Sequence, residues 1–464
     1  MNGKLEAAYP HRKRVSRQRP LWCSHCRDGH NVTLNLPHII TRFNMPSSVP
    51  ILAPPPQMPG VLVPKEDAHD LKEAVASHIG RDRTTFPGAQ PVSFGREHLD
   101  ELQQREYFMC EKTDGLRVLL FLHWYDDGQC LQPITFVIDR KNNFYRVEPA
   151  IRIPYWQMPE DREKFLFGTI LDGELVHDQY PGDPSPRLIY YVFDALAVDN
   201  QNVTTKSMDK RLGRMKEHVL KPYAKWLEQN PSLNIAHIQP FRLKEKQMHQ
   251  AYHLQHIFNN ILPQLKHGND GLIFTCKDTR YQFGTDQHIL KWKPPHENTI
   301  DFKLRLGDFP LIDPEDGEDG SVPDYDALPA PLQLLVQHNN NDYRPFAELH
   351  VTPAEWNIMK SLNQRLDGRI IECYRSPAGQ WKFKAEADGT PRWRDDKKDA
   401  NHISTVNSVL ASIENPVTET DLLGYEQKIK EAVYRIQGRP LPSHPGDDER
   451  EVKKRKFSEA NGQH

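Results

Sequence analysis

Short apolar runs separated by turn residues dominate the chain between residues 107 and 293. Runs of this length, rich in β-branched and aromatic residues, predict strands. The predicted strands are Tyr107–Glu111, Leu116–Trp124, Thr135–Asp139, Asn143–Val147, Thr169–Val176, Leu188–Leu196, Gly271–Cys276 and Ile289–Lys293. The turn Lys141-Asn142-Asn143 suits a hairpin, because Asn tolerates left-handed backbone. This region is therefore predicted to be α+β, with mostly antiparallel strands.

Helical periodicity appears in only a few segments of the same region. Residues Leu71–Ile79 predict a short helix, and Gln247–Leu265 predicts a longer one. Residues Met208–Gln229 predict an amphipathic helix, because apolar residues such as Met215 and Val219 recur on one side with Lys and Arg opposite.

The pattern changes after Pro294-Pro295. Five short strand candidates follow: Ile300–Leu306, Leu332–Gln337, Phe346–Val351, Gly368–Arg375 and Gln380–Glu386. Five strands in so short a stretch suit a five-stranded OB-type β-barrel. The acidic stretch 313–326 predicts a flexible loop, and His402–Ile413 and Asp421–Ile436 predict helices.

This pattern divides the chain into five parts. Residues 1–58 and 441–464 are predicted to be disordered tails, because they are polar, basic or proline-rich and lack periodicity. Between them we expect a mostly antiparallel α+β domain (59–297), an OB-fold domain (298–401) and C-terminal helices (402–440). The N-terminal tail holds Cys23-Ser24-His25-Cys26, which has zinc-like spacing but lacks a second ligand pair, so free thiols are expected.

Bulk composition narrows the class of protein. The chain has 464 residues, too many for one core, and a net charge of only -3, so a polyanion site must be a local cluster of Lys and Arg. Its mean hydropathy is -0.72 and no long apolar run occurs, so no membrane contact is expected. The basic run 453–456 is compatible with either a solvated tail or a nuclear import signal.

The most informative residue is Lys112, in the sequence Lys-Thr-Asp-Gly-Leu-Arg that ends at Arg117. A lysine amine is nucleophilic only when desolvation or nearby cations free its lone pair, and it can then attack phosphorus and hold a nucleotide covalently. Further motifs follow in a fixed order: Asp172-Gly173-Glu174-Leu175, Phe193-Asp194, 270–274, Leu290-Lys291-Trp292-Lys293-Pro294 and 392–397. The ordered set, more than any one motif, carries the interpretation.

This set resembles the covalent nucleotidyltransferase superfamily, which contains ATP-dependent DNA and RNA ligases and mRNA capping guanylyltransferases. The hexamer at Lys112, the segment 86–93 before it, Ile138-Asp139-Arg140, the motif around Lys291 and Lys293, and the closing Arg-x-Arg-x-Asp-Lys all resemble the capping branch, of the stand-alone fungal type. The resemblance implies that Lys112 attacks the α-phosphate of GTP, carries GMP and delivers it to the 5′-diphosphate end of RNA.

The resemblance also implies a role for each remaining motif residue. Arg117 and Glu174 are expected to hold the ribose, Phe193 to stack on guanine, and Lys246 to read the guanine edge, although a solvated lysine at a helix start is an alternative for Lys246. Lys291 and Lys293 are expected at the α-phosphate, and Asp270 with Glu174 at a divalent metal, Mg²⁺ or Mn²⁺. Four residues of the second domain are expected at the β- and γ-phosphates: Arg392, Arg394, Asp396 and Lys397.

Two other readings remain open from the residues alone. The first is an ATP-dependent DNA or RNA ligase, which uses the same machinery loaded with AMP. The second is a non-catalytic module that binds nucleic acid or a polymerase tail. The capping interpretation further implies a nuclear location, a separate RNA 5′-triphosphatase and the phosphorylated C-terminal tail of RNA polymerase II as partners.

Overall fold

The computed structural model describes residues 53–161, 163–232, 238–313, 320–386 and 388–442. Most of the two predicted tails lies outside the described residues, including Cys23, Cys26 and the basic run 453–456, as does the centre of the acidic stretch, 314–319. In the described part the fold is α+β with mostly antiparallel pairing, which confirms the predicted class. No helix among these residues combines the length and apolar character that a membrane crossing needs.

The larger sheet of the first region is built around two long central strands, β4 and β7. Its order is β1-β6-β5-β4-β7-β8-β10, with β9 paired to β8. The strands are β1 (Val61–Leu62), β4 (Leu116–Asp126), β5 (Leu131–Ile138), β6 (Phe144–Val147), β7 (Thr169–Asp178), β8 (Arg187–Val198), β9 (Gln201–Asn202) and β10 (Arg242–Glu245). The β5–β6 hairpin turns at Asn142, whose φ is 64°, as its sequence predicts.

The second sheet carries Lys112. Its order is β11-β3-β12-β13-β2, with β2 (Ala89–Ser93), β3 (Tyr107–Thr113), β11 (His249–Gln250), β12 (Asn269–Cys276) and β13 (Gly284–Trp292). Strands β2 and β13 are parallel, as are β8 and β10, so the antiparallel prediction holds for most pairs and not for these two. The sequence analysis missed β2 and β10, because each is short and contains polar residues or proline.

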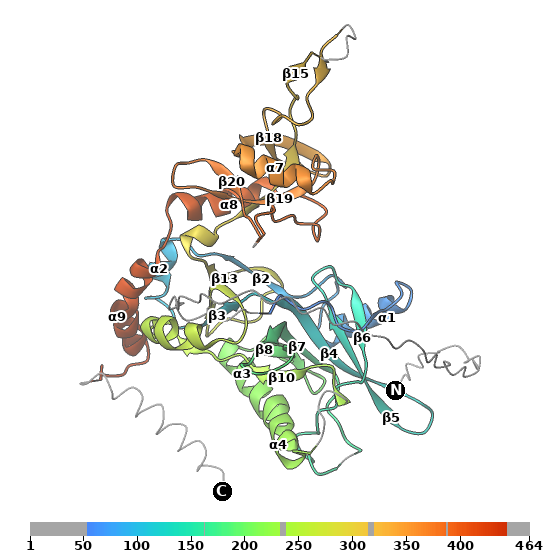
Figure 1. Ribbon diagram of the computed structural model, residues 1–464. Coiled ribbons are helices and arrows are strands. Elements are labelled where there is room, and N and C mark those ends of the chain that lie inside the picture. The colour runs from blue at the N-terminus through green and yellow to red at the C-terminus, as the bar shows by residue number, and fades with distance from the viewer. Residues whose placement is uncertain (1–52, 162, 233–237, 314–319, 387, 443–464) are drawn as a thin grey trace, which may run out of the picture. The chain divides into compact units, whose positions relative to one another are not determined.

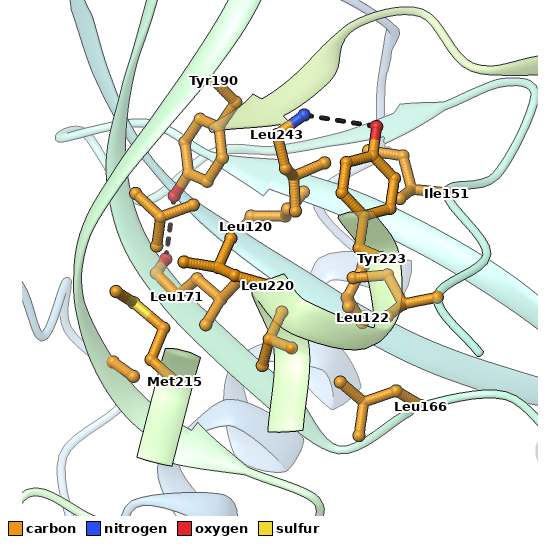
Figure 2. Close-up of a cluster of buried hydrophobic side chains, with 14 of the residues drawn as sticks. Leu120, Leu122, Ile151, Leu166, Leu171, Tyr190, Met215, Leu220, Tyr223 and Leu243 are labelled. Carbon is orange, nitrogen blue, oxygen red and sulfur yellow. Dashed lines mark hydrogen bonds between the residues drawn. The ribbon is translucent and has the colours of Figure 1, made fainter. Parts of the chain in front are cut away.

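The first sheet is covered on both faces, which explains why β4 reads as a continuous apolar run. Even-numbered residues such as Leu120 pack against a helical segment formed by α3 (Met208–Met215), η1 (Lys216–Leu220) and α4 (Lys221–Gln229). In this core the Tyr190 hydroxyl donates to the Leu171 carbonyl at 3.0 Å, and the Leu243 amide donates to the Tyr223 hydroxyl at 3.4 Å (Figure 2). Odd-numbered residues such as Leu119 pack against α1 (Asp67–His78), Ala89 and Tyr281.

Three helices were predicted in the first region. Leu71–Ile79 lies within α1 except for its last residue, which confirms that prediction. Residues 208–229 are helical throughout, as predicted. The predicted helix Gln247–Leu265 is wrong at its start, because His249 and Gln250 form β11 and pair with Met109 and Phe108. Helical turns begin only at α6 (Leu254–His256) and continue through η2 (Ile257–Ile261) and η3 (Leu262–Gln264). Pairing with an open sheet edge outweighed local helix propensity.

The C-terminal region contains a five-stranded sheet in the order β18-β17-β14-β19-β20. Its strands are β14 (Ile300–Arg305), β17 (Gln333–Asn339), β18 (Asp342–Glu348), β19 (Ile370–Arg375) and β20 (Trp381–Phe383). One isolated parallel bridge, Leu349 to Trp381, joins the edge strands, and α7 (Pro353–Ser361) packs into the same core. Five strands were predicted; closure into an OB-type barrel, and the domain boundaries, remain predictions.

The described flanks of the acidic stretch are not simple loop. Strand β15 (Leu311–Ile312), just before the stretch, pairs with β16 (Val322–Pro323) inside it, so the flexible-loop prediction is wrong at Val322–Pro323 (Figure 1).

The two C-terminal helices belong to different cores, which the sequence did not indicate. Helix α8 (Ile403–Glu414) packs against the C-terminal sheet through Val406. Helix α9 (Glu419–Ile436) packs against the sheet that carries Lys112, and Arg96, which precedes α2 (Glu97–Glu101), bonds its first turn at Asp421 (Figure 1). The Trp292 indole donates to the Val417 carbonyl at 2.7 Å. The C-terminal helix therefore supports the back of the strand that holds Lys291.

Candidate active site

Three predicted site residues meet at the end of the second sheet. The Lys112 Nζ lies 2.5 Å from Asp270 Oδ1, and the Lys293 Nζ lies 2.7 Å from Asp270 Oδ2. Strand β12 lies between β3 and β13 in the sheet, so Asp270 stands between the two lysines. The side chains are partly exposed, at 24%, 22% and 25% for Lys112, Asp270 and Lys293. A partly exposed cluster of two cations around one central carboxylate results.

A β-bulge aims Asp270 at the lysines. The register of β12 against β3 shifts between Asn269 and Leu272, so Asp270 and Gly271 together lie opposite Lys112 and β12 carries one extra residue. Gly271 has a φ of 147°, and a Cβ there would lie 2.0 Å from the Trp292 carbonyl oxygen. Only glycine fits this position, and the Asp-Gly pair in the sequence is the local signal for the bulge.

The lysine charges around Asp270 lower both its own pKa and the pKa of Lys291. Burial alone raises the pKa of Asp270, but Lys293 and Lys112 outweigh it and hold the pKa below its usual value. For Lys291, burial and the charges of Lys293 and Lys112 act in the same direction and lower the pKa to about 8. Lys291 is thus a cation that can lose its proton near neutral pH.

Arg117 is held rigidly between the two sheets. Its Nε and Nη2 donate to the two oxygens of Asp172, at 3.0 and 2.7 Å, and its Nη1 donates to the Ala89 carbonyl at 2.5 Å. The Tyr281 hydroxyl donates to Asp172 Oδ2 at 2.6 Å and accepts from the Ala89 amide at 3.0 Å. Asp172 is 1% exposed. The guanidinium predicted to hold ribose is therefore fixed in direction before any ligand arrives.

Glu174 is the in-register partner of Arg117 across the β4–β7 pair, but the guanidinium reaches past it to Asp172. Burial raises the pKa of Glu174 to about 7, against the opposing effect of Lys246 and Lys112. Its carboxylate makes no ion pair among the described residues, so it remains available to a ligand hydroxyl or cation. Both predicted uses of Glu174 remain predictions.

Phe193 lies on the partly exposed face of β8, and the Arg117 guanidinium sits 5.5 Å from its ring centroid. Its neighbour Asp194 points inward and forms a buried pair with Arg211, at 2.7 Å through both Nε and Nη2. The alternation along β8 thus separates a structural acid from an accessible aromatic ring. This position is compatible with stacking on a base.

Lys246 is buried, not a solvated residue at a helix start. It is 3% exposed, follows β10, and lies 2.9 Å from Glu111; it also bonds the Thr113 hydroxyl. The alternative interpretation of Lys246 is therefore wrong, because the predicted helix does not begin there. Its partners flank Lys112 on β3, and its charge is the first opposing influence on the pKa of Glu174. Lys246 thus lies close to the candidate site.

The four predicted residues of the C-terminal region are engaged with carboxylates. Arg394 bonds both oxygens of Asp301 at 3.1 Å and both oxygens of Asp396 at 3.0 Å. Lys397 also bonds Asp301, which is 5% exposed. Arg392 bonds Glu386 at 2.8 Å. Asp301 therefore holds the two cations of this cluster together, and their predicted contact with phosphates requires that they exchange these partners.

The donor set suits a divalent cation only in company with phosphate. Among the described residues no three His, Cys, Asp or Glu side chains converge as a ligand group. Asp270 and Glu174 are close enough for the Asp270 charge to raise the pKa of Glu174. A hard cation such as Mg²⁺ commonly takes one or two carboxylates and completes its shell with water and substrate phosphates. The chain fits that arrangement.

Comparison with known proteins agrees with this geometry. A model of the mRNA capping enzyme catalytic domain matches residues 56–295, and one of the mRNA capping enzyme C-terminal domain matches residues 297–423. The chain belongs to the mRNA capping enzyme family. It is therefore a nucleotidyltransferase, and the non-catalytic reading loses its support.

Named capping relatives cover nearly the whole chain. The mRNA-capping enzyme subunit alpha of Schizosaccharomyces pombe is 41% identical over 404 residues, covering 86% of this chain and 95% of the relative. That of Neurospora crassa is 42% identical, covering 81% and 92%, and that of Saccharomyces cerevisiae is 35% identical, covering 84% and 90%. Among solved structures, a mycobacterial DNA ligase D complexed with ATP and MES is 15% identical with a TM-score of 0.29, covering 67% of this chain and 95% of that one.

Several residues of this capping-enzyme site escaped the sequence analysis. Ala89 on the other sheet and Tyr281 on the connection between β12 and β13 orient the Arg117–Asp172 pair, and Glu111 holds Lys246. Asp172 and Glu111 lie in or beside quoted motifs, so their position was visible but not their partners. Tyr281 carries no local signal, because its role depends on a contact 109 residues away in sequence.

Proposed function

We propose that this capping-enzyme family member is a GTP–RNA guanylyltransferase that works through a lysyl-GMP intermediate on Lys112. The observation that carries the proposal is the placement of Lys112 beside Asp270 and Lys293, with the deprotonatable Lys291 on the neighbouring strand.

The first half-reaction forms a P–N bond. The Lys112 Nζ loses a proton, for which Asp270 Oδ1 is the nearest acceptor, and attacks the α-phosphorus of GTP. The bond from that phosphorus to the bridging oxygen breaks, and pyrophosphate leaves. Lys291 and Lys293 stabilise the charge that develops on the α-phosphate oxygens. A divalent cation, Mg²⁺ or Mn²⁺, held by Asp270 and Glu174 with the phosphates, supplies Lewis-acid stabilisation when bound.

The second half-reaction transfers GMP to RNA and regenerates the free Lys112 amine. A terminal oxygen of the 5′-diphosphate RNA attacks the phosphorus of the adduct, and the P–N bond breaks with the electron pair going to Lys112. Arg117 and Glu174 keep the ribose in place through both steps, and Phe193 stacks on guanine while Lys246 contacts its edge. The C-terminal cations Arg392, Arg394 and Lys397, with Asp396 orienting Arg394, assist departure of pyrophosphate in the first step only.

The proposed partners and cellular location follow from the substrates of this reaction. A 5′-diphosphate RNA acceptor requires an RNA 5′-triphosphatase, which we propose to be a separate partner. The substrate is nascent mRNA, so we also propose a nuclear location and an association with the phosphorylated C-terminal tail of RNA polymerase II.

Incubation with α-labelled GTP or α-labelled ATP and a divalent cation tests the proposal. We expect the protein to acquire label from GTP, to retain it through denaturation, and to pass it to 5′-diphosphate RNA. Label from ATP alone would indicate the ligase reading. Mass spectrometry of the loaded protein should place GMP on Lys112, and an adduct on another residue would overturn the proposed intermediate.

A further inference from the structure

A group of cations outside the nucleotide pocket has no assigned role. Arg81 and Arg83 lie on the loop after α1, Arg140 and Lys141 lie on the β5–β6 turn, and Lys72 lies on α1. We call these five residues the basic cluster. The two loops are joined directly, because the Asn142 side chain donates to the Thr84 carbonyl at 2.7 Å. Lys72, Arg81, Arg83 and Asn142 line one narrow gap in the surface, which is too small to hold a water molecule.

The basic cluster lacks carboxylate partners in the part of the chain that the structure describes. Arg81 donates to the Thr85 carbonyl, Arg140 to the Gln90 side chain and Lys141 to a backbone carbonyl, all of them neutral acceptors. Most other cations near the site are paired, as Lys112, Arg117 and Lys246 are. Unpaired neighbouring cations repel one another, and a bound polyanion relieves that cost.

Nearby acids do not neutralise the cluster. Asp139 is occupied by its own turn, where it accepts from the Lys141 and Asn143 amides. Asp70 and Glu73 of α1 do not line the gap, which Lys72 does. Asp82 is exposed between Arg81 and Arg83 and is the one acid inside the loop. Burial and then the charge of the neighbouring Arg83 lower the pKa of Arg81, so the two arginines repel each other.

The cluster is continuous with the nucleotide pocket. Burial and then the charge of Arg117 lower the pKa of Arg140, and Arg140 in turn is one of the charges that lower the pKa of Lys291. Contacts between aromatic rings also link the basic cluster to the nucleotide-binding residues. The Arg81 guanidinium lies 4.6 Å from the Phe283 ring, and Phe283 contacts Tyr281, the residue that orients Asp172. A chain of phosphates that leaves the site at Arg140 meets the remaining cations next.

We propose that the basic cluster binds the phosphate backbone of the acceptor RNA downstream of its 5′ end. This inference rests on the proposed function, because it takes the RNA acceptor as given and assigns its path. Single-stranded nucleic acid is commonly bound by a line of cations beside exposed apolar or aromatic surface, and the affinity is then sensitive to salt. The cluster would recognise the charge and spacing of phosphates, which are the same in every RNA. It can therefore bind RNA of any sequence, as an enzyme acting on many transcripts requires.

The test separates the two half-reactions in the variant Lys72→Ala/Arg83→Ala/Lys141→Ala. Formation of enzyme–GMP from labelled GTP should stay close to wild type, because none of the three is assigned to the nucleotide and, among the described residues, Lys141 contacts only the backbone carbonyl of Asp396. Transfer to a 5′-diphosphate RNA of about 20 nucleotides, longer than a typical single-strand footprint, should show a KM raised on the order of tenfold. Transfer to a trinucleotide acceptor should keep its KM, because that acceptor is too short to reach the cluster.

Salt dependence gives an independent readout. The slope of log K for the long RNA against log salt should fall in magnitude by about 0.7 for each phosphate contact removed. The matched control is Lys210→Ala/Lys225→Ala/Arg242→Ala, which removes three exposed cations elsewhere and should leave both KM and slope unchanged. If the triple variant did not fold, Arg83→Glu at its exposed position repeats the comparison.

The outcomes are distinguishable from failure of the proposed function. Absence of label in the wild-type protein contradicts the guanylyltransferase proposal itself. Normal labelling with an unchanged KM for long RNA in the variant overturns only the RNA path. Loss of phosphoserine-peptide binding with unchanged RNA transfer would make the cluster a peptide surface instead, and loss of enzyme–GMP formation would make it part of the nucleotide site.

Discussion

Arg117 and Asp172 form a doubly hydrogen-bonded ion pair that spans adjacent strands β4 and β7. Ala89 on β2 of the opposite sheet and Tyr281 on the connection between β12 and β13 complete it. The pair is mostly buried, so its charges are compensated by each other and not by water. It therefore couples the packing of the two sheets to the direction of a side chain that faces the nucleotide pocket.

Removal of one partner should destabilise the first region strongly. Asp172→Ala leaves the Arg117 guanidinium buried without a counter-charge, and we expect a loss of about 3–5 kcal/mol in the free energy of unfolding. Tyr281→Phe removes one hydrogen bond and should cost about 1 kcal/mol. Denaturant unfolding measures both. Equal losses in the two variants would show that the ion pair is not the dominant interaction.

Lys112→Ala should abolish covalent labelling while the protein stays folded. Asp270 keeps Lys293 as a partner, so the substitution leaves no unpaired charge in the pocket. Gel electrophoresis after incubation with α-labelled GTP gives the measurement. Lys277→Ala is the matched control, because Lys277 is also a strand-end lysine paired with a carboxylate, Glu106 at 2.9 Å, and should label normally. Labelling of the Lys112→Ala protein would show that another nucleophile acts.

The pH dependence of kcat/KM for GTP should be bell-shaped. Glu174 acts as an acceptor only when ionised, so activity should rise as pH increases through about 7, the raised pKa of this group. Lys291 binds phosphate only when protonated, so activity should fall as pH increases through about 8, its lowered pKa. The maximum is then expected between these values.

The variant Lys291→Arg isolates the alkaline limb. A guanidinium stays charged at high pH, so the fall above about pH 8 should disappear even if the maximal rate is lower. Titration of the GTP phosphates affects wild type and variant alike. An unchanged alkaline limb in the variant would assign that limb to a group other than Lys291.

Arg394→Ala should affect the two half-reactions unequally. Its predicted role is to orient the leaving pyrophosphate, so enzyme–GMP formation should fall on the order of 10²–10³-fold. Transfer from enzyme–GMP loaded by prolonged incubation should fall much less, whereas Lys293→Ala should impair both steps. Rapid-quench assays of each step give the comparison. Arg369→Ala, which removes a neighbouring arginine paired with Asp395, is the control. Equal loss in both steps would contradict the role assigned to Arg394.

Chelation of divalent cations should stop adduct formation reversibly. Asp270→Asn keeps the shape of the side chain but loses its charge. It should therefore weaken binding of the cation and lower the maximal rate. The half-saturating Mg²⁺ or Mn²⁺ concentration, measured with labelled GTP, should rise about 10-fold or more for the loss of one carboxylate ligand. Asp278→Asn, at a nearby acid outside the pocket, is expected to behave as wild type. Unchanged cation dependence in Asp270→Asn would place the cation elsewhere.

The sequence by itself determined the strands that bear the chemistry and the order of the motifs along them. Period-two and continuous apolar runs placed β3, β4, β7, β8 and β12 to within a few residues, because strands buried on one or both faces leave a direct imprint on hydrophobicity. The turn at Asn142 was also readable, since special backbone angles restrict residue choice locally.

Only the tertiary structure decided which residues share a partner. Lys246 is buried and pairs with Glu111, although a solvated position at a helix start was an alternative. Tyr281 supports Asp172, and α9 packs behind Trp292, in a different core from α8. Each of these contacts joins residues far apart in the chain. The energy of such a contact depends on burial and on the partner that folding supplies, and neither is encoded in the local pattern of polar and apolar residues.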